Sequence, residues 1–172
     1  MNESKESSFV KFLEELKDDR AALAKLRRGL GKKGGTSEMC RYVARFVPND
    51  AKPYITERYF LIAALFALYP ESAGRGASMG KVFRVMAAAS PSVEKRFENL
   101  LSVDADDLRG HLRQAVSLAK SKGVPVNFHQ LFHDIRYWNH PERDVQMRWA
   151  REFWGYEKEQ VDNQTESKGE AQ

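Results

Sequence analysis

The amino-acid sequence predicts an all-α protein, a helical bundle of about eight to nine helices in two halves. Apolar residues recur at three- and four-residue spacing in almost every segment, and no stretch alternates as a half-buried strand would. Proline, glycine and helix-capping residues separate these segments. The 172 residues are 42% hydrophobic and 11% aromatic, which suffices for a packed core without metals or disulfides.

The N-terminal helical part is expected over residues 1–70. Its first helix, long or broken, ends at a basic, glycine-rich loop over residues 29–35. Ser37 is placed to cap the next helix, and Pro53 to open a third that continues to residue 69. This third segment is apolar nearly all round, so we expect it to be the central helix. The apolar stripe of the first helix comprises Phe9, Phe12, Leu13, Leu16, Ala22, Leu23 and Leu26.

The C-terminal helical bundle is expected over residues 78–156, after a linker at residues 71–77 that is rich in glycine and small residues. Ser78 caps its first helix, and each later helix follows a proline or a run of acids. These start signals are Ser90-Pro91, Asp104 to Asp107, Val124-Pro125 and His140-Pro141. Residues 157–172 lack apolar density and are predicted to form a disordered tail.

The aromatic residues of the C-terminal bundle recur at helical spacing, which is more typical of a core than of a surface that stacks on bases. We assign most of them to packing between helices. Cys40 is the single cysteine, so no intramolecular disulfide can form, and its apolar surroundings predict a buried position. The aromatic set comprises Phe128, Phe132, Tyr137, Trp138, Trp149, Phe153 and Trp154.

Positive charge is concentrated in the body of the chain. The sequence has a net charge of +4, but residues 1–19 and 157–172 each carry −3, so residues 20–156 carry +10. Six lysines and arginines stand between residues 20 and 35, and the first acid after them is Glu38. Because charge of one sign repels itself unless a polyanion offsets it, we expect this segment to bind a nucleic-acid backbone. The candidate contacts are Arg27, Arg28, Lys32 and Lys33.

Two further basic elements follow. The first has no acid between Glu71 and Glu94, and its glycines, Gly80 among them, are expected to let a polynucleotide approach the backbone closely. The segment GRGASMGKV is not a phosphate-binding loop, because no Ser or Thr follows Lys81 and no strand precedes it. The candidate contacts here are Lys81, Arg84 and Arg96. The second element mixes acids with arginines that packing beside aromatic residues explains equally well, namely Arg109, Arg113, Arg136, Arg143, Arg148 and Arg151.

No catalytic constellation stands out. His129 and His133 lie one helical turn apart as in zinc peptidases, but Gln130 occupies the position of the general-base glutamate and no third ligand accompanies the pair. The acids at residues 104–107 are those that the dipole of a helix N-terminus favours, so they do not indicate a nuclease. We therefore expect a protein that is not an enzyme and uses no metal or cofactor, with a histidine-based metal hydrolase as an alternative.

Several segments, by their order and spacing over about residues 9–156, resemble the CasB family. These proteins are the small subunits of type I-E CRISPR surveillance complexes, called Cascade. The matching segments are DRAALAKLRRGLG, SMGKVFRVM, the stretch from SPSVEKRFENLL to GVPVNF, and the closing W..PE..VQ.RWAREFW.

This resemblance implies a non-catalytic helical subunit with DNA in a basic groove. Family members are thought to stabilise the R-loop, in which guide RNA pairs with target DNA and the other strand is displaced, for antiviral defence. The implied partners are both DNA strands, a second copy lying head to tail, and the other Cascade subunits with their guide RNA. The positions that match family motifs are Arg27 and Arg28, Lys81 and Arg84, Arg96, and Arg143 and Arg148.

The sequence also bears on the cellular location of the protein and leaves a second function open. The N-terminus lacks the pattern of a secretion signal, and the apolar run at residues 59–69 is too short to span a bilayer. We expect a cytoplasmic protein with no membrane partner. A generic helical adaptor that binds an acidic protein surface would show the same basic patches, and it remains an alternative.

Overall fold

The chain folds into a helical bundle in a computed structural model that describes residues 4–73 and 77–155. The prediction of an all-α fold is confirmed, because the described residues contain helices and no strand. In chain order the helices of these residues are α1 (Lys5–Glu15), α2 (Arg20–Arg27), α3 (Ser37–Val43), α4 (Pro53–Leu68), α5 (Met79–Ala87), α6 (Ser92–Ser102), α7 (Ala105–Lys122), α8 (Phe128–Arg136) and α9 (Asp144–Trp154).

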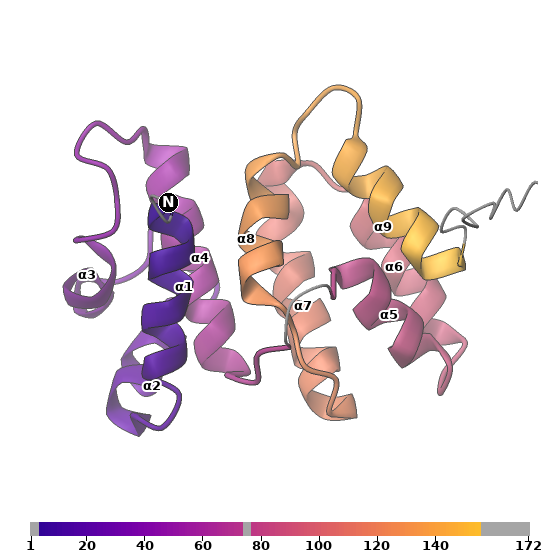
Figure 1. Cartoon of the computed structure of the whole chain (residues 1–172), viewed down its shortest axis with the longest axis horizontal. Coiled ribbons are helices and arrows are strands. Elements are labelled where there is room, and N and C mark those ends of the chain that lie inside the picture. Colours follow the sequence, from indigo (N-terminus) through magenta and orange to yellow (C-terminus); the bar gives the residue numbers. More distant parts are fainter. Residues whose placement is uncertain (1–3, 74–76, 156–172) are drawn as a thin grey trace, which may run out of the picture.

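Helix α4 occupies the centre of the N-terminal side, as its sequence predicts. All nine residues from 59 to 67 are buried, so the helix must be covered on every side. Helices α2 and α3 cover it on one side, and α7 and α8 on the other. Helices α5, α6 and α9 pack beyond α7 at the opposite end of the molecule (Figure 1). Among residues 4–73 and 77–155, no helical segment combines the length and hydropathy that a bilayer crossing requires.

The two halves of the chain share one apolar core. Buried residues from α1, α4, α7 and α8 belong to a single cluster, and α1 packs directly on α8. Where the linker was predicted, Ser72 forms an isolated bridge with Val126, and the Ala73 amide donates to the Val126 carbonyl at 3.0 Å. The division into two parts stays a prediction. Residues 74–76 of the linker and the predicted tail at 157–172 lie outside the described residues.

Side-chain caps mark the start of four of the helices in the described residues, namely α1, α2, α5 and α8. The first helix is broken, because Asp19 accepts a hydrogen bond from the Ala22 amide at 3.0 Å and so starts α2 anew. Ser78 caps α5 as predicted, accepting from the Gly80 amide at 3.1 Å. Helix α3 begins one residue earlier than its predicted cap implies, since Thr36 is the N-cap residue and Ser37 is already helical.

The prediction that Cys40 is buried was wrong. Met39 and Val43 point into the core from α3, and Cys40, rotated about 100° from Met39 around the helix, is exposed. Its thiol lies 3.7 Å from the Thr36 carbonyl. The core assignment of the aromatic residues is confirmed for most of them, because all but Tyr137 and Trp154 of that set are buried.

Gly80 serves helix packing and does not face a polynucleotide, contrary to the expectation from the sequence. It is buried at the start of α5, where α9 crosses. A Cβ atom at this position would lie 2.8 Å from the Trp149 Cα and still closer to the Trp149 carbonyl oxygen. The missing side chain is what lets the two backbones approach each other.

We expect Gly80→Ala to destabilise the protein by about 1–3 kcal/mol, because the new methyl group meets backbone atoms that cannot move independently. Gly110→Ala is the matched control, since a Cβ there meets nothing within 4 Å and should stabilise α7 by about 0.5–1 kcal/mol. Urea unfolding followed by circular dichroism measures both. Equal effects at the two glycines would contradict the close packing of α5 on α9.

Candidate nucleic-acid interface

The loop that follows α2 carries the main cationic surface. It is held in place from two sides, by α4 and by α7. Gly35 has a φ of +74° and lies so close to the Phe60 ring of α4 that a Cβ could not be accommodated. The Arg109 guanidinium of α7 donates a hydrogen bond to the Lys32 carbonyl at 2.9 Å. The basic side chains of this loop therefore project from a fixed backbone.

Four predicted contact residues lie together at the end of α2 and in this loop, and all are exposed: Arg27, Arg28, Lys32 and Lys33. Arg28 is paired, because its Nη1 lies 2.7 Å from both carboxylate oxygens of Glu38. This hydrogen bond lowers the pKa of Glu38, and the charges of Lys25 and Lys32 act in the same direction. In the described part of the chain, Arg27, Lys32 and Lys33 have no carboxylate within 4.0 Å.

The structure adds two arginines that the sequence had left in a mixed-charge set. Arg109 contacts the loop backbone at Lys32, and the Arg113 guanidinium lies beside Gly31, 3.5 Å from the position that a Cβ would occupy. Both come from α7, more than 70 residues further along the chain. We call the surface made by Arg27, Arg28, Lys32, Lys33, Arg109 and Arg113 the basic loop surface. No local sequence signal identified Arg109 and Arg113 as part of this surface.

The second predicted set lies at the other end of the molecule, on α5 and α6. Lys81 is half-buried, whereas Arg84 and Arg96 are exposed. Arg84 lies beside Gly155 at the end of α9, and Arg96 lines a small cavity of about 50 Å³ with His111 of α7. The two arginines thus lie against different helices.

Arg143 and Arg148 both make hydrogen bonds that stabilise the fold. Arg143 precedes α9 in a left-handed conformation with a φ of +54°, and its guanidinium donates to the Leu101 carbonyl. Arg148 pairs with Asp134, whose side chain is fully buried. Asp134 also accepts from the Trp149 indole at 2.7 Å and from the Gln130 side-chain amide at 2.8 Å. DNA contact by these two arginines stays a prediction.

The two histidines of the predicted metal alternative contact protein groups. His129 Nε2 lies 3.6 Å from a Glu14 oxygen of α1, and His133 Nδ1 lies 3.5 Å from Asp134. Neither belongs to a cluster of three metal-ligating residues within the described residues. His129 is half-buried and His133 is exposed, and each imidazole lies beside one carboxylate of the same chain.

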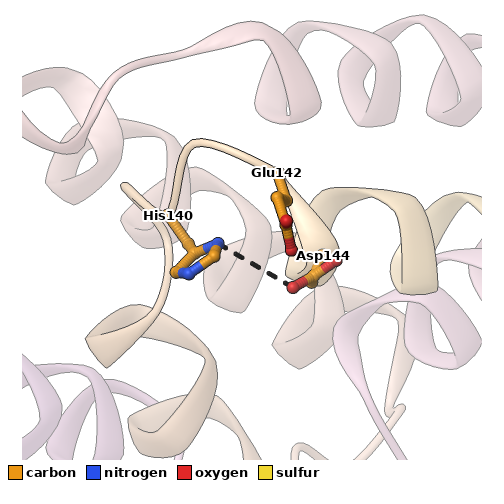
Figure 2. A group of neighbouring side chains, drawn as sticks. All are labelled: His140, Glu142 and Asp144. Atoms are coloured by element: carbon orange, nitrogen blue, oxygen red, sulfur yellow. Dashed lines mark ion pairs between the residues drawn. The ribbon is translucent and has the colours of Figure 1, made fainter.

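A different group, His140, Glu142 and Asp144, does bring three potential ligand atoms within 4.8 Å of one another. Figure 2 shows these side chains in the turn that leads into α9, with an ion pair of 3.8 Å between His140 and Asp144. All three are exposed, and the positive end of the α9 dipole opposes a cation there. The helix dipole favours acids at this position, which explains the group without a metal ion.

Comparisons with known proteins identify the family. The model of the family described as CRISPR-associated protein Cse2 matches residues 22–154. A protein of that description from Thermus thermophilus is 36% identical over 152 residues, covering 86% of this chain and 88% of the relative. The chain belongs to the CRISPR-associated Cse2 family, also called CasB.

Solved structures of the Cse2 family share the fold. The crystal structure of a Cse2 protein from Thermus thermophilus has a TM-score of 0.79 and 35% identity, covering 89% of this chain and 99% of that chain. The crystal structure of CasB from M. ruber has a TM-score of 0.77 and 29% identity, covering 89% of this chain and 94% of that chain. A chain of a CRISPR RNA-guided surveillance complex has a TM-score of 0.74 at 23% identity, which shows the same fold.

We expect Asp134→Ala to destabilise this Cse2 protein by about 1–3 kcal/mol, because it leaves the buried Trp149 indole without an acceptor, whereas the partly exposed Arg148 can be solvated by water. Asp50→Ala, which removes an exposed loop carboxylate, should change stability by less than about 0.5 kcal/mol. Urea denaturation gives both values. Equal small effects in the two variants would contradict a stabilising role of the buried Asp134 hydrogen bonds.

Proposed function

We propose that this chain is a non-catalytic small subunit of a type I-E CRISPR surveillance complex, Cascade, that stabilises the R-loop by binding DNA strands. Membership of the Cse2 family supports the CRISPR context. The shared fold with a chain of an RNA-guided surveillance complex supports the assembly. The proposed partners are the two DNA strands, a second copy of the chain and the other subunits with their guide RNA, in the cytoplasm.

The basic loop surface is the observation that carries this proposal. Its cations are exposed except for the half-buried Arg109, and within the described part of the chain only Arg28 among them has a carboxylate within 4.0 Å. The loop that carries most of them is held by α4 and α7. A rigid array of this kind suits a phosphate backbone, whose charges are regularly spaced. Lys81, Arg84 and Arg96 offer a second contact region. The hydrogen bonds of Arg143 and Arg148 leave these two the least available to DNA.

Contacts to charge and backbone shape are sufficient for this function. In guide-directed recognition, base pairing with the guide RNA reads the sequence, so the small subunit needs no readout of base edges. Exchange of the DNA duplex for the heteroduplex is nearly balanced in free energy. A few phosphate contacts of about 1 kcal/mol each would therefore shift the R-loop equilibrium tenfold or more.

We expect Arg27→Glu/Lys32→Glu to lower R-loop stability by about 30-fold at low salt, because two phosphate contacts of about 1 kcal/mol are lost. In a plot of the logarithm of the R-loop equilibrium constant against the logarithm of the salt concentration, the slope should become shallower by about 1.4–1.8. The measurement is R-loop dissociation from guide-loaded complex that contains the variant, on a matched target at several salt concentrations.

Lys120→Glu/Arg151→Glu serves as the control with the same change in charge. Lys120 lies near the end of α7 opposite to Arg109, about 16 Å away along the helix. Equal losses in the two variants would assign the effect to net charge alone. No loss in either variant, with both incorporated into the complex, would favour an adaptor that binds an acidic protein.

Glu38→Gln should have the opposite effect and strengthen binding of a single-stranded oligothymidine by about fivefold, because it frees Arg28 and removes a negative charge beside Lys25 and Lys32. Fluorescence anisotropy at low salt measures the change. Glu142→Gln, an exposed acid before α9, is the matched control and should leave the affinity nearly unaltered. The same gain in both variants would contradict a specific role of the basic loop surface.

A further inference from the structure

A cavity of about 420 Å³ opens beside the basic loop surface, where α4, α7 and the end of α8 meet. Its floor is apolar and is made by the buried residues Leu61, Leu108 and Ile135, one from each of these helices. We call it the α4/α7/α8 pocket. Its volume lies within the range of typical small-ligand sites, about 300–1,000 Å³.

The rim of this pocket carries three cations. Lys33 is exposed, whereas Arg58 and Arg109 are half-buried. Burial lowers the pKa of both guanidinium groups. Tyr54 and Glu6 oppose this effect at Arg58, where the charge of Arg136 adds to it, and Glu57 opposes it at Arg109. In the residues that the structure describes, no carboxylate lies within 4.0 Å of Arg58 or Arg109. An anion at the rim would offset the cost of holding these charges partly out of water.

The walls of the pocket suit a planar, polar ring. Tyr54 is half exposed, and the Arg58 guanidinium lies over its ring at 5.1 Å from the centroid. A tyrosine and a guanidinium are the groups on which nucleobases stack. Asn139, Glu57 and Asp106 also line the pocket and offer hydrogen-bonding groups to the edge of a base.

The rim is continuous with the basic loop surface. Lys33 belongs to both, and Arg109 binds the Lys32 carbonyl while lining the pocket. A DNA strand whose phosphates lie along the loop would therefore pass the mouth of the pocket. Three cations and two acids, Glu57 and Asp106, leave the lining with one net positive charge.

We propose that the α4/α7/α8 pocket accepts one nucleoside phosphate unit of an unpaired DNA strand, with the base against Tyr54 and the phosphate at Arg58 and Arg109. This inference rests on the proposed function and deepens it. It makes the small subunit a clamp that holds a strand at one unstacked base, in addition to a surface that attracts the backbone.

The test is photo-crosslinking in the guide-loaded complex. R-loops are formed on targets that carry 5-iodo-2′-deoxyuridine in the displaced strand or, in a separate arm, in the target strand. After irradiation, adducts are located by mass spectrometry of the digested subunit. We expect an adduct on Tyr54 in one of the two arms.

The variant Ala105→Leu fills the pocket from an exposed position at the start of α7 and introduces no aromatic ring. It should reduce the Tyr54 adduct about tenfold, the size of effect expected when one base loses its stacking partner. Ala88→Leu, at an exposed position after α5, is the matched control and should leave the yield unchanged. Arg58→Gln should also reduce the yield, whereas Arg151→Gln should not.

The outcomes separate the two proposals. Adducts confined to residues outside the pocket, in R-loops that still depend on Arg27 and Lys32, would overturn the pocket and leave the proposed function standing. R-loops that do not depend on the basic loop surface would overturn the proposed function itself. A third arm replaces the labelled strands with free 5-iodo-2′-deoxyuridine 5′-monophosphate. A Tyr54 adduct with this free nucleotide, and none with either labelled strand, would assign the pocket to a free nucleotide and overturn the strand assignment.

Discussion

The apolar surface of α4 is the constraint on which the rest of the structure depends. A helix whose residues 59–67 are all buried cannot lie at the edge of a fold, so other helices must cover its whole circumference. Helices α2 and α3 meet one side, and α7 and α8 meet the other. This requirement joins the two halves of the chain in one core. It also fixes the neighbours of the loop after α2, because Phe60 of α4 occupies the space beside Gly35.

The positive charge of the chain is divided between two uses. Some arginines stabilise the fold, as Arg148 does beside the buried Asp134 and Arg143 does at the Leu101 carbonyl. Others stand on exposed surface with no carboxylate of the described residues within 4.0 Å, as Arg27 and Lys32 do. Removal of Arg148 is costly whatever it binds, because Asp134 is left buried without its counter-charge. The charge of Arg27 or Lys32 is solvated by water, so a polyanion can bind there without breaking an ion pair.

The α4/α7/α8 pocket contains arginines that resemble both groups, since they are partly buried but form no ion pair in the described residues. Its arginines are partly withdrawn from water, as structural arginines are, yet no carboxylate of the described residues lies within 4.0 Å of them; Glu6 and Glu57 act on them only from a greater distance. An apolar floor, a half-exposed tyrosine and this cationic rim together form a site with the chemistry of a nucleotide. The basic loop surface and the pocket share Lys33, so backbone attraction and capture of a base would act on the same strand.

The sequence by itself determined the all-helical class, the central position of α4, most helix starts and the basic segment at residues 20–35. These features are local, because they depend on apolar periodicity, capping side chains and charge density along the chain. Only the tertiary structure decided that Arg109 and Arg113 join the loop, that Arg148 neutralises Asp134, that Gly80 packs α5 on α9 and that Cys40 is exposed. These contacts join residues that are distant in sequence, or they depend on small rotations of a helix. The spacing of residues in one segment contains no information on which surface of another segment will pack against it.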